Sequence, residues 1–220
     1  MVLERLELDE SKNMIIGPKY KIARRLGDAI FPKTQKPRFA MVESKKRANL
    51  TKKRKHRSNT TEFGLQFLEK QKVRYTYGLG ERQMANYIKK AKSAPGTKPL
   101  DELFKLLERR LDNVVFRTGL ASTRQFGRQI SNHGHITVNG KRVSIPSYTV
   151  KVGDKIGVYK GSAAKTLFKD KAAELKEMKT PTWIKFSPET LEATITALPM
   201  PGENETNLNF GSVVQFYSRV

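Results

Sequence analysis

Two arginines spaced four residues apart, Arg124 and Arg128, have the types and spacing to bind phosphate groups. They share one face of a predicted helix that follows Ser122 and Thr123, with Ser122 as the expected cap. Guanidinium groups bind phosphate oxygens through paired hydrogen bonds, and hydroxyl groups at a helix start add neutral donors. This pattern predicts a surface that binds the phosphates of a nucleic acid.

Further basic residues in the sequence point to the same chemistry. In an amino-terminal group, cations alternate with aromatic residues around Tyr75–Gly80, as expected for base stacking combined with phosphate contact. An alternative for these tyrosines is ordinary core packing with a hydrated hydroxyl group. The predicted RNA contacts of the amino-terminal group are Lys19, Arg24, Arg25, Lys70, Lys72, Arg74, Tyr77 and Arg82, and those near the arginine pair are Arg110, Arg117, His133, Lys141 and Arg142.

A basic run between Lys45 and Arg57 contains eight Lys or Arg residues, His56 and no acidic residue. Like charges repel and the run has little apolar surface to bury, so it is predicted to stay mobile until it binds phosphates. A solvated tail or a targeting patch is the alternative. The predicted RNA contacts in the run are Lys52, Lys53, Arg54, Lys55 and Arg57.

The sequence offers no recognised catalytic constellation. It has no P-loop and no nucleophile elbow, and Gly78-Leu79-Gly80 lacks the third glycine of a dinucleotide fingerprint. His133 and His135 supply only two metal ligands where zinc needs three or four, so no metal site is predicted. Acidic pairs such as Asp101-Glu102 are expected on a solvated surface. The chain is therefore predicted not to be an enzyme and to need no cofactor.

The composition agrees with a polyanionic partner. The 220 residues carry 43 Lys plus Arg and 21 Asp plus Glu, a formal net charge of +22. Release of counterions from a phosphate backbone favours such a chain on any nucleic acid. No apolar run approaches the ~18 residues of a spanning helix, and the first nineteen residues contain four acids, so neither a membrane nor an export signal is expected. The absence of cysteine fits a reducing cytoplasm.

The expected elements are arranged as an α+β protein. Two helices are predicted over 61–92, interrupted at 75–80, and the Pro- and Gly-rich segment 93–99 marks a linker. A helix over about 100–119 and a second one ending at Gly134 precede a hairpin with its turn at Asn139-Gly140. Alternating apolar residues over 148–158 complete a small antiparallel sheet packed on the two helices.

Three ordered segments in this region resemble the RNA-binding domain named after small-subunit ribosomal protein S-four. The segments are Leu107–Arg117, Ser122–Arg124 and Val138–Lys141. The same domain occurs in RNA-modifying enzymes and translation-accessory proteins, which form the alternative class. A DNA binder that uses the helix pair as a reading head is a third possibility.

The rest of the chain is similar to the bacterial-type ribosomal family itself. The matching segments are Gly17-Pro18-Lys19, Arg24-Arg25, Glu69–Arg74, Tyr77-Gly78, Glu81–Gln83, Pro181–Trp183 and Phe216–Arg219. The resemblance implies direct binding to small-subunit ribosomal RNA early in assembly, at a multi-helix junction of the 5′ domain. It also implies neighbouring ribosomal proteins as partners, a place near where mRNA enters the subunit, and a cytoplasmic ribosome, with an organellar ribosome as the alternative.

The chain departs from the family in two respects. Many members hold zinc with amino-terminal cysteines, which are absent here, and the basic run replaces a Gly-rich segment. The predicted domains are residues 1–99 with 171–220, mainly helical, and an inserted RNA-binding module over 100–170. The acid-rich carboxy-terminal end, 187–220, is expected to face protein or solvent. Reversing Arg124 and Arg128 to Glu is predicted to weaken RNA binding without lowering the melting temperature.

Overall fold

The computed structural model describes residues 16–53, 61–169, 171–175, 180–202 and 208–219 of the chain. Backbone contacts divide it into two compact units. One contains Lys89–Thr206 and is called the sheet unit here; the other contains Lys12–Ile88 and Asn207–Val220 and is called the helical unit. The boundary between the two units falls within one helix, α4 (Glu81–Ser93).

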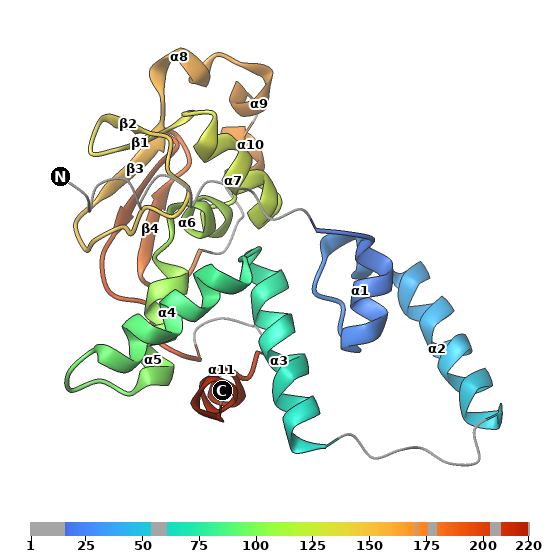
Figure 1. The fold of residues 1–220 in the computed structure, drawn as a ribbon. Helices are drawn as coiled ribbons and strands as arrows, with labels where there is room; N and C mark the ends of the chain where they lie inside the picture. Colours follow the sequence, from blue (N-terminus) through green and yellow to red (C-terminus); the bar gives the residue numbers. More distant parts are fainter. Residues whose placement is uncertain (1–15, 54–60, 170, 176–179, 203–207, 220) are drawn as a thin grey trace. The chain divides into compact units, whose positions relative to one another are not determined.

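The sheet unit is built on a five-stranded antiparallel sheet with the strand order β2-β1-β3-β5-β4 (Figure 1). Its strands are short, and every neighbouring pair runs antiparallel. They are β1 (Ile136–Val138), β2 (Lys141–Val143), β3 (Lys155–Val158), β4 (Ile184–Ser187) and β5 (Glu192–Ile195).

The predicted hairpin is present between β1 and β2. Asn139 has a φ of 52° and Gly140 a φ of 78°, the left-handed pair that a tight two-residue turn requires. The register pairs Val138 with Lys141 and Ile136 with Val143. The turn sequence therefore fixes which strand residues face the core.

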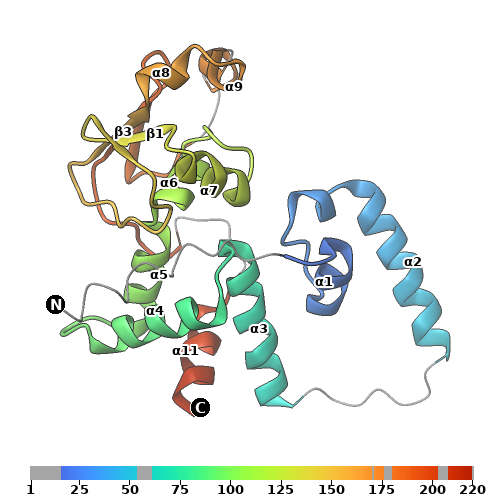
Figure 2. The ribbon, with the colours of Figure 1, turned by 45° about the horizontal axis from the view of Figure 1, so that its top comes forward.

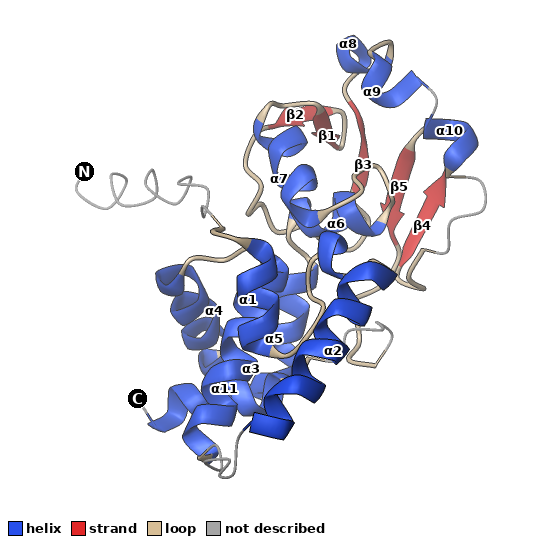
Figure 3. Ribbon diagram, turned by 90° about the vertical axis from the view of Figure 1, so that its right-hand side faces the viewer, coloured by secondary structure: helices blue, strands red, loops and turns tan. Residues whose placement is uncertain are grey.

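Two helices, α6 (Leu111–Arg117) and α7 (Arg124–Asn132), pack on this sheet, as Figure 3 shows. Helix α5 (Pro99–Glu108) precedes them in the chain and contacts α6. Leu111, Val115 and Ile130 are almost fully buried against Ile136 and Ile156 of the sheet. The α+β prediction of two helices on a small antiparallel sheet is thus confirmed.

The helix predicted over 100–119 is two helices, which corrects the sequence prediction. Arg110 has an extended backbone, with φ −68° and ψ 138°. The amide of Leu111 donates to the Tyr148 carbonyl at 2.9 Å, and that of Val150 donates to the Arg109 carbonyl at 2.9 Å. Thr149 lies in the same loop as Tyr148 and Val150 and forms an isolated β-bridge with Arg110. The strand that the alternation at 148–152 predicted is therefore reduced to this single bridge.

Three short helices and the two last strands complete the sheet unit. The helices are α8 (Lys160–Ala163), α9 (Thr166–Lys169) and α10 (Lys171–Glu174). Phe168 and Leu175 enter the same core as the sheet, together with Trp183. Strands β4 and β5 belong to this sheet. The sequence had assigned residues 171–220 to the same domain as the amino-terminal part, so the observed division of the chain differs from the predicted one.

The described residues of the helical unit form α-helices and one 3₁₀ turn, and Figure 2 shows this unit from a second angle. In addition to the first part of α4, its elements are α1 (Lys19–Leu26), η2 (Pro32–Thr34), α2 (Pro37–Lys53), α3 (Glu62–Tyr77) and α11 (Phe210–Arg219). Helix α3 is capped at its start by Thr61, whose hydroxyl accepts from the Gly64 amide at 3.2 Å, and at its end by Gly78, which has a φ of 65°. The predicted pair of helices separated near Tyr75–Gly80 is therefore confirmed.

The basic run differs from its prediction where the structure describes it. The backbone of 45–53 is helical and forms the second half of α2. Lys, Arg, Ala and Leu are good helix formers, and a helix satisfies its own backbone hydrogen bonds without a core. Residues 54–57 of the run lie outside the described residues. Within the described part of the chain, no helix is long and apolar enough to cross a membrane.

Candidate nucleic-acid interface

A buried carboxylate, that of Glu108, organises the first group of arginines in the sheet unit. Glu108 is fully buried at the end of α5 and accepts two hydrogen bonds from Arg117, both at 3.0 Å. The side-chain amide of Asn113 also donates to Glu108 at 3.0 Å, and its oxygen accepts from Arg124 at 2.7 Å. The Arg124 guanidinium lies 4.5 Å from the ring centroid of Phe116. Two arginines are thus held by one carboxylate, one of them through an amide.

A second buried carboxylate, that of Asp112, joins α6 to α7. Arg110 donates to both of its oxygens, at 3.0 and 2.8 Å, and Arg128 donates to Oδ2 at 3.0 and 2.9 Å. Burial would raise the pKa of Asp112, but the guanidinium groups of Arg110 and Arg128 lower it below its ordinary value. Asp112 is therefore ionised and serves as a fixed counter-charge.

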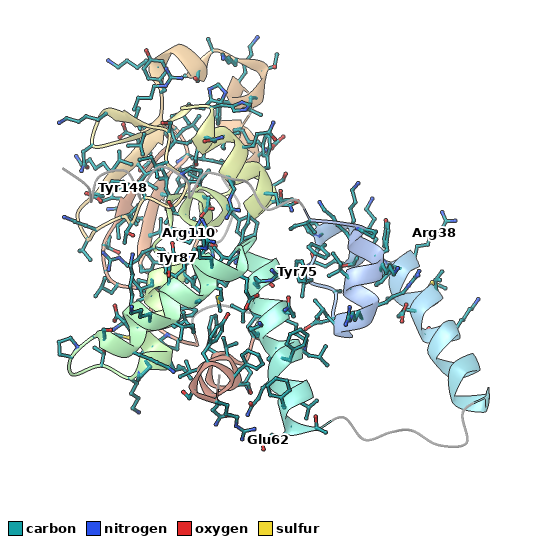
Figure 4. The ribbon with its side chains drawn as sticks, in the orientation of Figure 1. Arg38, Glu62, Tyr75, Tyr87, Arg110 and Tyr148 are labelled. Carbon is teal, nitrogen blue, oxygen red and sulfur yellow. The ribbon has the colours of Figure 1, made fainter. Side chains whose placement is uncertain are left out.

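These hydrogen-bond networks determine the burial and orientation of four arginines that were predicted to contact RNA. Arg110 is only 2% exposed, so the structure places it in the interior (Figure 4), where it cannot meet RNA without unfolding. Arg117, Arg124 and Arg128 are partly exposed and oriented by their partners. A held guanidinium loses little entropy when it binds a phosphate, so these three stay candidates for RNA contact.

The end of α7 and the hairpin carry the most accessible predicted contacts. His133, Lys141 and Arg142 are exposed, as is Ser122 before α7. The helix cap is Thr123, whose hydroxyl accepts from the Phe126 amide at 3.0 Å, and not Ser122 as predicted.

Several exposed cations of the sheet unit were not predicted as contacts. The sequence features that could have identified them are the polar positions of the strands and the repeated lysines after β3. A contact between residues far apart in the sequence, such as the 2.8 Å hydrogen bond between His135 and Ser162, leaves no such feature in the sequence. The unpredicted exposed lysines are Lys151, Lys155, Lys160, Lys165, Lys169 and Lys185.

In the helical unit, Lys70 is an internal residue. It is 6% exposed, and its ammonium group lies 5.1 Å from the ring centroid of Phe67, 4.6 Å from that of Phe216 and 5.5 Å from that of Tyr217. It also donates to the Glu81 carboxylate. This cage attaches α11 to α3, which is a structural role and not a surface contact.

Glu81 receives a second hydrogen bond in the same cage, from the Tyr217 hydroxyl at 2.8 Å. Burial would raise the pKa of Glu81, but the hydrogen bonds from Lys70 and Tyr217 lower it. Burial and the neighbouring Glu81 both raise the pKa of Tyr217. The carboxylate is therefore charged and the phenol neutral at physiological pH.

The remaining predicted contacts of the helical unit divide into tied and accessible side chains. Lys72 donates to Glu69 at 2.7 Å, and Arg74 lies 4.7 Å from the Tyr75 ring centroid. Tyr77 is 2% exposed, so RNA bases cannot stack on its ring. Lys19 is half-buried, whereas Arg24, Arg25 and Arg82 are exposed; Arg24 also pairs with Glu43 at 3.1 Å.

The contacts predicted in the basic run are only partly described. The backbone at Lys52 and Lys53 belongs to α2, and Arg54, Lys55 and Arg57 lie outside the described residues. No group of three or more potential metal ligands occurs among the residues that the structure describes. Without any cysteine, the chain cannot form a cysteine-ligated zinc site.

Comparison with known proteins agrees with both halves of the sequence. Residues 14–108 match the ribosomal protein S4/S9 N-terminal domain, and residues 109–156 match the S4 domain. The small ribosomal subunit protein uS4 of Roseiflexus sp. (strain RS-1) is 43% identical over 209 residues, covering 92% of this chain and 98% of the relative.

Relatives from other bacteria are similar over the same extent. The proteins of the same name from Chloroflexus aurantiacus (strain ATCC 29366 / DSM 635 / J-10-fl) and Listeria monocytogenes serotype 4b (strain F2365) are 39% and 42% identical, covering 93% and 92% of this chain and 98% of each relative. The resemblance found in the sequence is confirmed. The chain belongs to the uS4 family of small ribosomal subunit proteins.

Proposed function

We propose that this chain is a structural component of the small ribosomal subunit and binds its ribosomal RNA directly. Relatives named as small-subunit ribosomal proteins match nearly its whole length, including both the amino-terminal domain and the S4 domain. This family consists of structural proteins, and the chain is accordingly not an enzyme. An RNA-modifying protein that borrows the same domain would instead match only around 109–156.

The observation that carries RNA binding is the pair of buried carboxylates. Glu108 and Asp112 are 0% and 2% exposed, and each accepts hydrogen bonds from a partly exposed arginine, Arg117 and Arg128 respectively. Preorganised guanidinium forks suit the fixed spacing of phosphates in a folded RNA better than mobile lysines do. The exposed hairpin cations Lys141 and Arg142 extend the same charge.

The finer role that we propose is early binding to a multi-helix junction in the 5′ domain of the ribosomal RNA. A rigid basic surface can hold the phosphates of several helices at fixed distances, which favours the folded junction over its unfolded forms. Neighbouring ribosomal proteins are proposed as further partners, with the acid-rich end of the chain as one surface for them. Contact with mRNA stays a prediction from the family resemblance.

Binding measurements at increasing salt test this function. The full-length chain is titrated with the 5′ domain of small-subunit ribosomal RNA, an unrelated folded RNA and duplex DNA. Each phosphate neutralised steepens the log–log salt dependence by about 0.7 to 0.9 for any nucleic acid, so only specific contacts leave a preference at high salt. A surviving preference for the ribosomal RNA is expected, and an equal loss on all three targets would refute the proposal.

A pair of lysine variants maps the surface. Lys141 on β2 and Lys185 on β4 are both exposed strand lysines at opposite edges of the sheet. Lys141→Glu is expected to weaken binding of the ribosomal RNA, whereas Lys185→Glu, the matched control, changes the charge equally but should weaken it less. Equal effects would mean that only net charge matters.

A further inference from the structure

Three basic side chains lie together where α7 ends and the hairpin begins, and a fourth, Lys165, is near enough to act electrostatically on one of them. His133 and His135 stand on either side of Gly134, with ring centroids 6.0 Å apart. Arg142 comes from β2, and Lys165 lies between α8 and α9. His133, Arg142 and Lys165 are exposed and His135 is half-buried, so the group lies at the protein surface. We call these four residues the histidine cluster.

The backbone of the turn anchors Arg142. Its Nε donates to the Gly134 carbonyl at 2.7 Å and its Nη2 donates to the His133 carbonyl at 2.9 Å, while the guanidinium lies 5.3 Å from the Tyr159 ring centroid. Gly134 has a φ of 68°, and a Cβ placed there would lie 2.3 Å from the Arg142 Nε. Glycine at this position is therefore what allows the guanidinium to dock beside the two histidines.

The imidazole of His135 is also held in one orientation. Its Nδ1 makes a hydrogen bond of 2.8 Å with the hydroxyl of Ser162, which is 3% exposed. Its ring contacts that of Phe168 edge to face, with centroids 6.2 Å apart. Because Nδ1 is engaged by the serine, Nε2 is the ring nitrogen that can meet a ligand.

The electrostatics of the histidine cluster favour an anion. Burial lowers the pKa of His135, and Lys165, His133 and Arg142 lower it further. The charged groups that act on this imidazole are thus cationic, contributed by the end of α7, by β2 and by the α8–α9 segment. Tyr159, which precedes α8, is a further titratable side chain beside Arg142. An anion placed among these groups would offset their mutual repulsion.

We propose that His133, His135, Arg142 and Lys165 together bind one phosphodiester group of the RNA backbone, and that His135 takes up a proton from solvent as the phosphate binds. A guanidinium fork, an ammonium group and two imidazoles offer hydrogen-bond donors that suit phosphate oxygens. The negative charge restores the affinity of the imidazole for a proton, so binding and protonation reinforce each other. This subsite rests on the proposed function and adds a pH dependence to it.

The first experiment measures affinity for the 5′ domain of small-subunit ribosomal RNA between about pH 5.5 and about pH 8, the range in which histidine titrates. The wild-type affinity is expected to fall as pH rises, by at most about tenfold per pH unit for a single coupled proton. His135→Gln keeps a polar side chain beside Ser162 but cannot be protonated. It is expected to bind RNA with a weaker pH dependence than wild type, because only His133 remains to titrate in the cluster, and to take up fewer protons in calorimetry with buffers of different ionisation enthalpy.

A second pair of variants avoids the folding risk of a partly buried residue. Lys165→Ala is expected to weaken binding by on the order of tenfold and to reduce the salt slope by up to about 0.9. Lys185→Ala, on β4 at the far edge of the sheet from β2, is the matched control and should change both quantities less. Thermal melts of all variants verify that the fold is retained.

The outcomes separate this inference from the function on which it rests. If the wild-type chain shows no preference for the ribosomal RNA at high salt, the proposed function fails. If the preference is present but wild type and His135→Gln show the same pH dependence, and Lys165→Ala binds like Lys185→Ala, only the subsite is refuted. A change of the His135 imidazole resonances with inorganic phosphate but not with RNA would assign the cluster to free anions and also overturn it.

Discussion

Replacing Asp112 with Asn is expected to destabilise the sheet unit strongly. The substitution preserves the size of the side chain, but it removes the negative charge and turns one acceptor oxygen into a donor. Four hydrogen bonds of 2.8 to 3.0 Å from Arg110 and Arg128 converge on this carboxylate. The variant would therefore leave the Arg110 guanidinium, at 2% exposure, without its charged partner.

The size of the effect follows from the burial of that pair. Removing one partner of a buried ion pair costs about 3–5 kcal/mol, because the other charge stays buried. The Arg128 side chain is 15% exposed, so water compensates part of its loss and the lower half of the range is expected. With a urea m-value of about 2 kcal/mol per molar, the unfolding midpoint should fall by about 1.5–2 M.

Urea unfolding followed by tryptophan fluorescence measures this effect in the right part of the chain. Trp183 is the single tryptophan, is 1% exposed and belongs to the core of the sheet unit. Asp101→Asn is the matched control, since Asp101 is a partly exposed carboxylate in the first turn of α5. Equal midpoints for Asp112→Asn and Asp101→Asn would refute the account of the buried network.

The pH dependence gives an independent test of the same network. The pKa of Asp112 is lowered from its ordinary value of 3.8, so the folded state favours the ionised form. The stability that this carboxylate contributes is complete above its unfolded pKa and is lost as pH falls through its folded pKa. The stability gap between wild type and Asp112→Asn should therefore be constant near neutral pH and should close only below 3.8. A gap that closes near neutrality would contradict this assignment.

Three further substitutions test the roles of other side chains. Lys70→Met is expected to cost about 2 kcal/mol through lost cation–π and ionic contacts, seen as faster hydrogen exchange in α11, with unchanged RNA affinity. Gly134→Ala should cost at least about 1 kcal/mol, because the residue has a positive φ and crowds Arg142, and calorimetry should show a lower melting temperature. Arg128→Glu should lower the melting temperature as well as the RNA affinity, since it faces Asp112; an unchanged melt would instead support the prediction from sequence alone.

Local signals in the sequence sufficed for much of the fold. Asn139-Gly140 specifies a two-residue turn whatever its surroundings, and the structure has that turn with both residues at positive φ. Gly78 ends α3 in the same local manner, through its left-handed backbone. The family was identifiable because short motifs with defined spacing extend along nearly the whole chain.

Long-range contacts account for what the sequence did not indicate. No glycine or proline marks the break in the helix at Arg110. The break is stabilised by backbone hydrogen bonds to the distant loop Pro146–Val150, which the residues around Arg110 do not reveal. Lys70 was interpreted as a surface cation because the rings that enclose it include Phe216 and Tyr217, from the other end of the chain. Charge alone does not distinguish a cation that awaits RNA from one that already has an internal partner.

Sedimentation of the full-length chain with ribosomes tests the central claim most directly. A tagged copy is expressed in the cells from which the protein comes, and the lysate is separated on a sucrose gradient at low magnesium, where the two ribosomal subunits dissociate. The chain is expected to sediment with the small subunit and to stay there after a high-salt wash. Recovery in the free-protein fractions, or with the large subunit, would contradict its assignment as a small-subunit component.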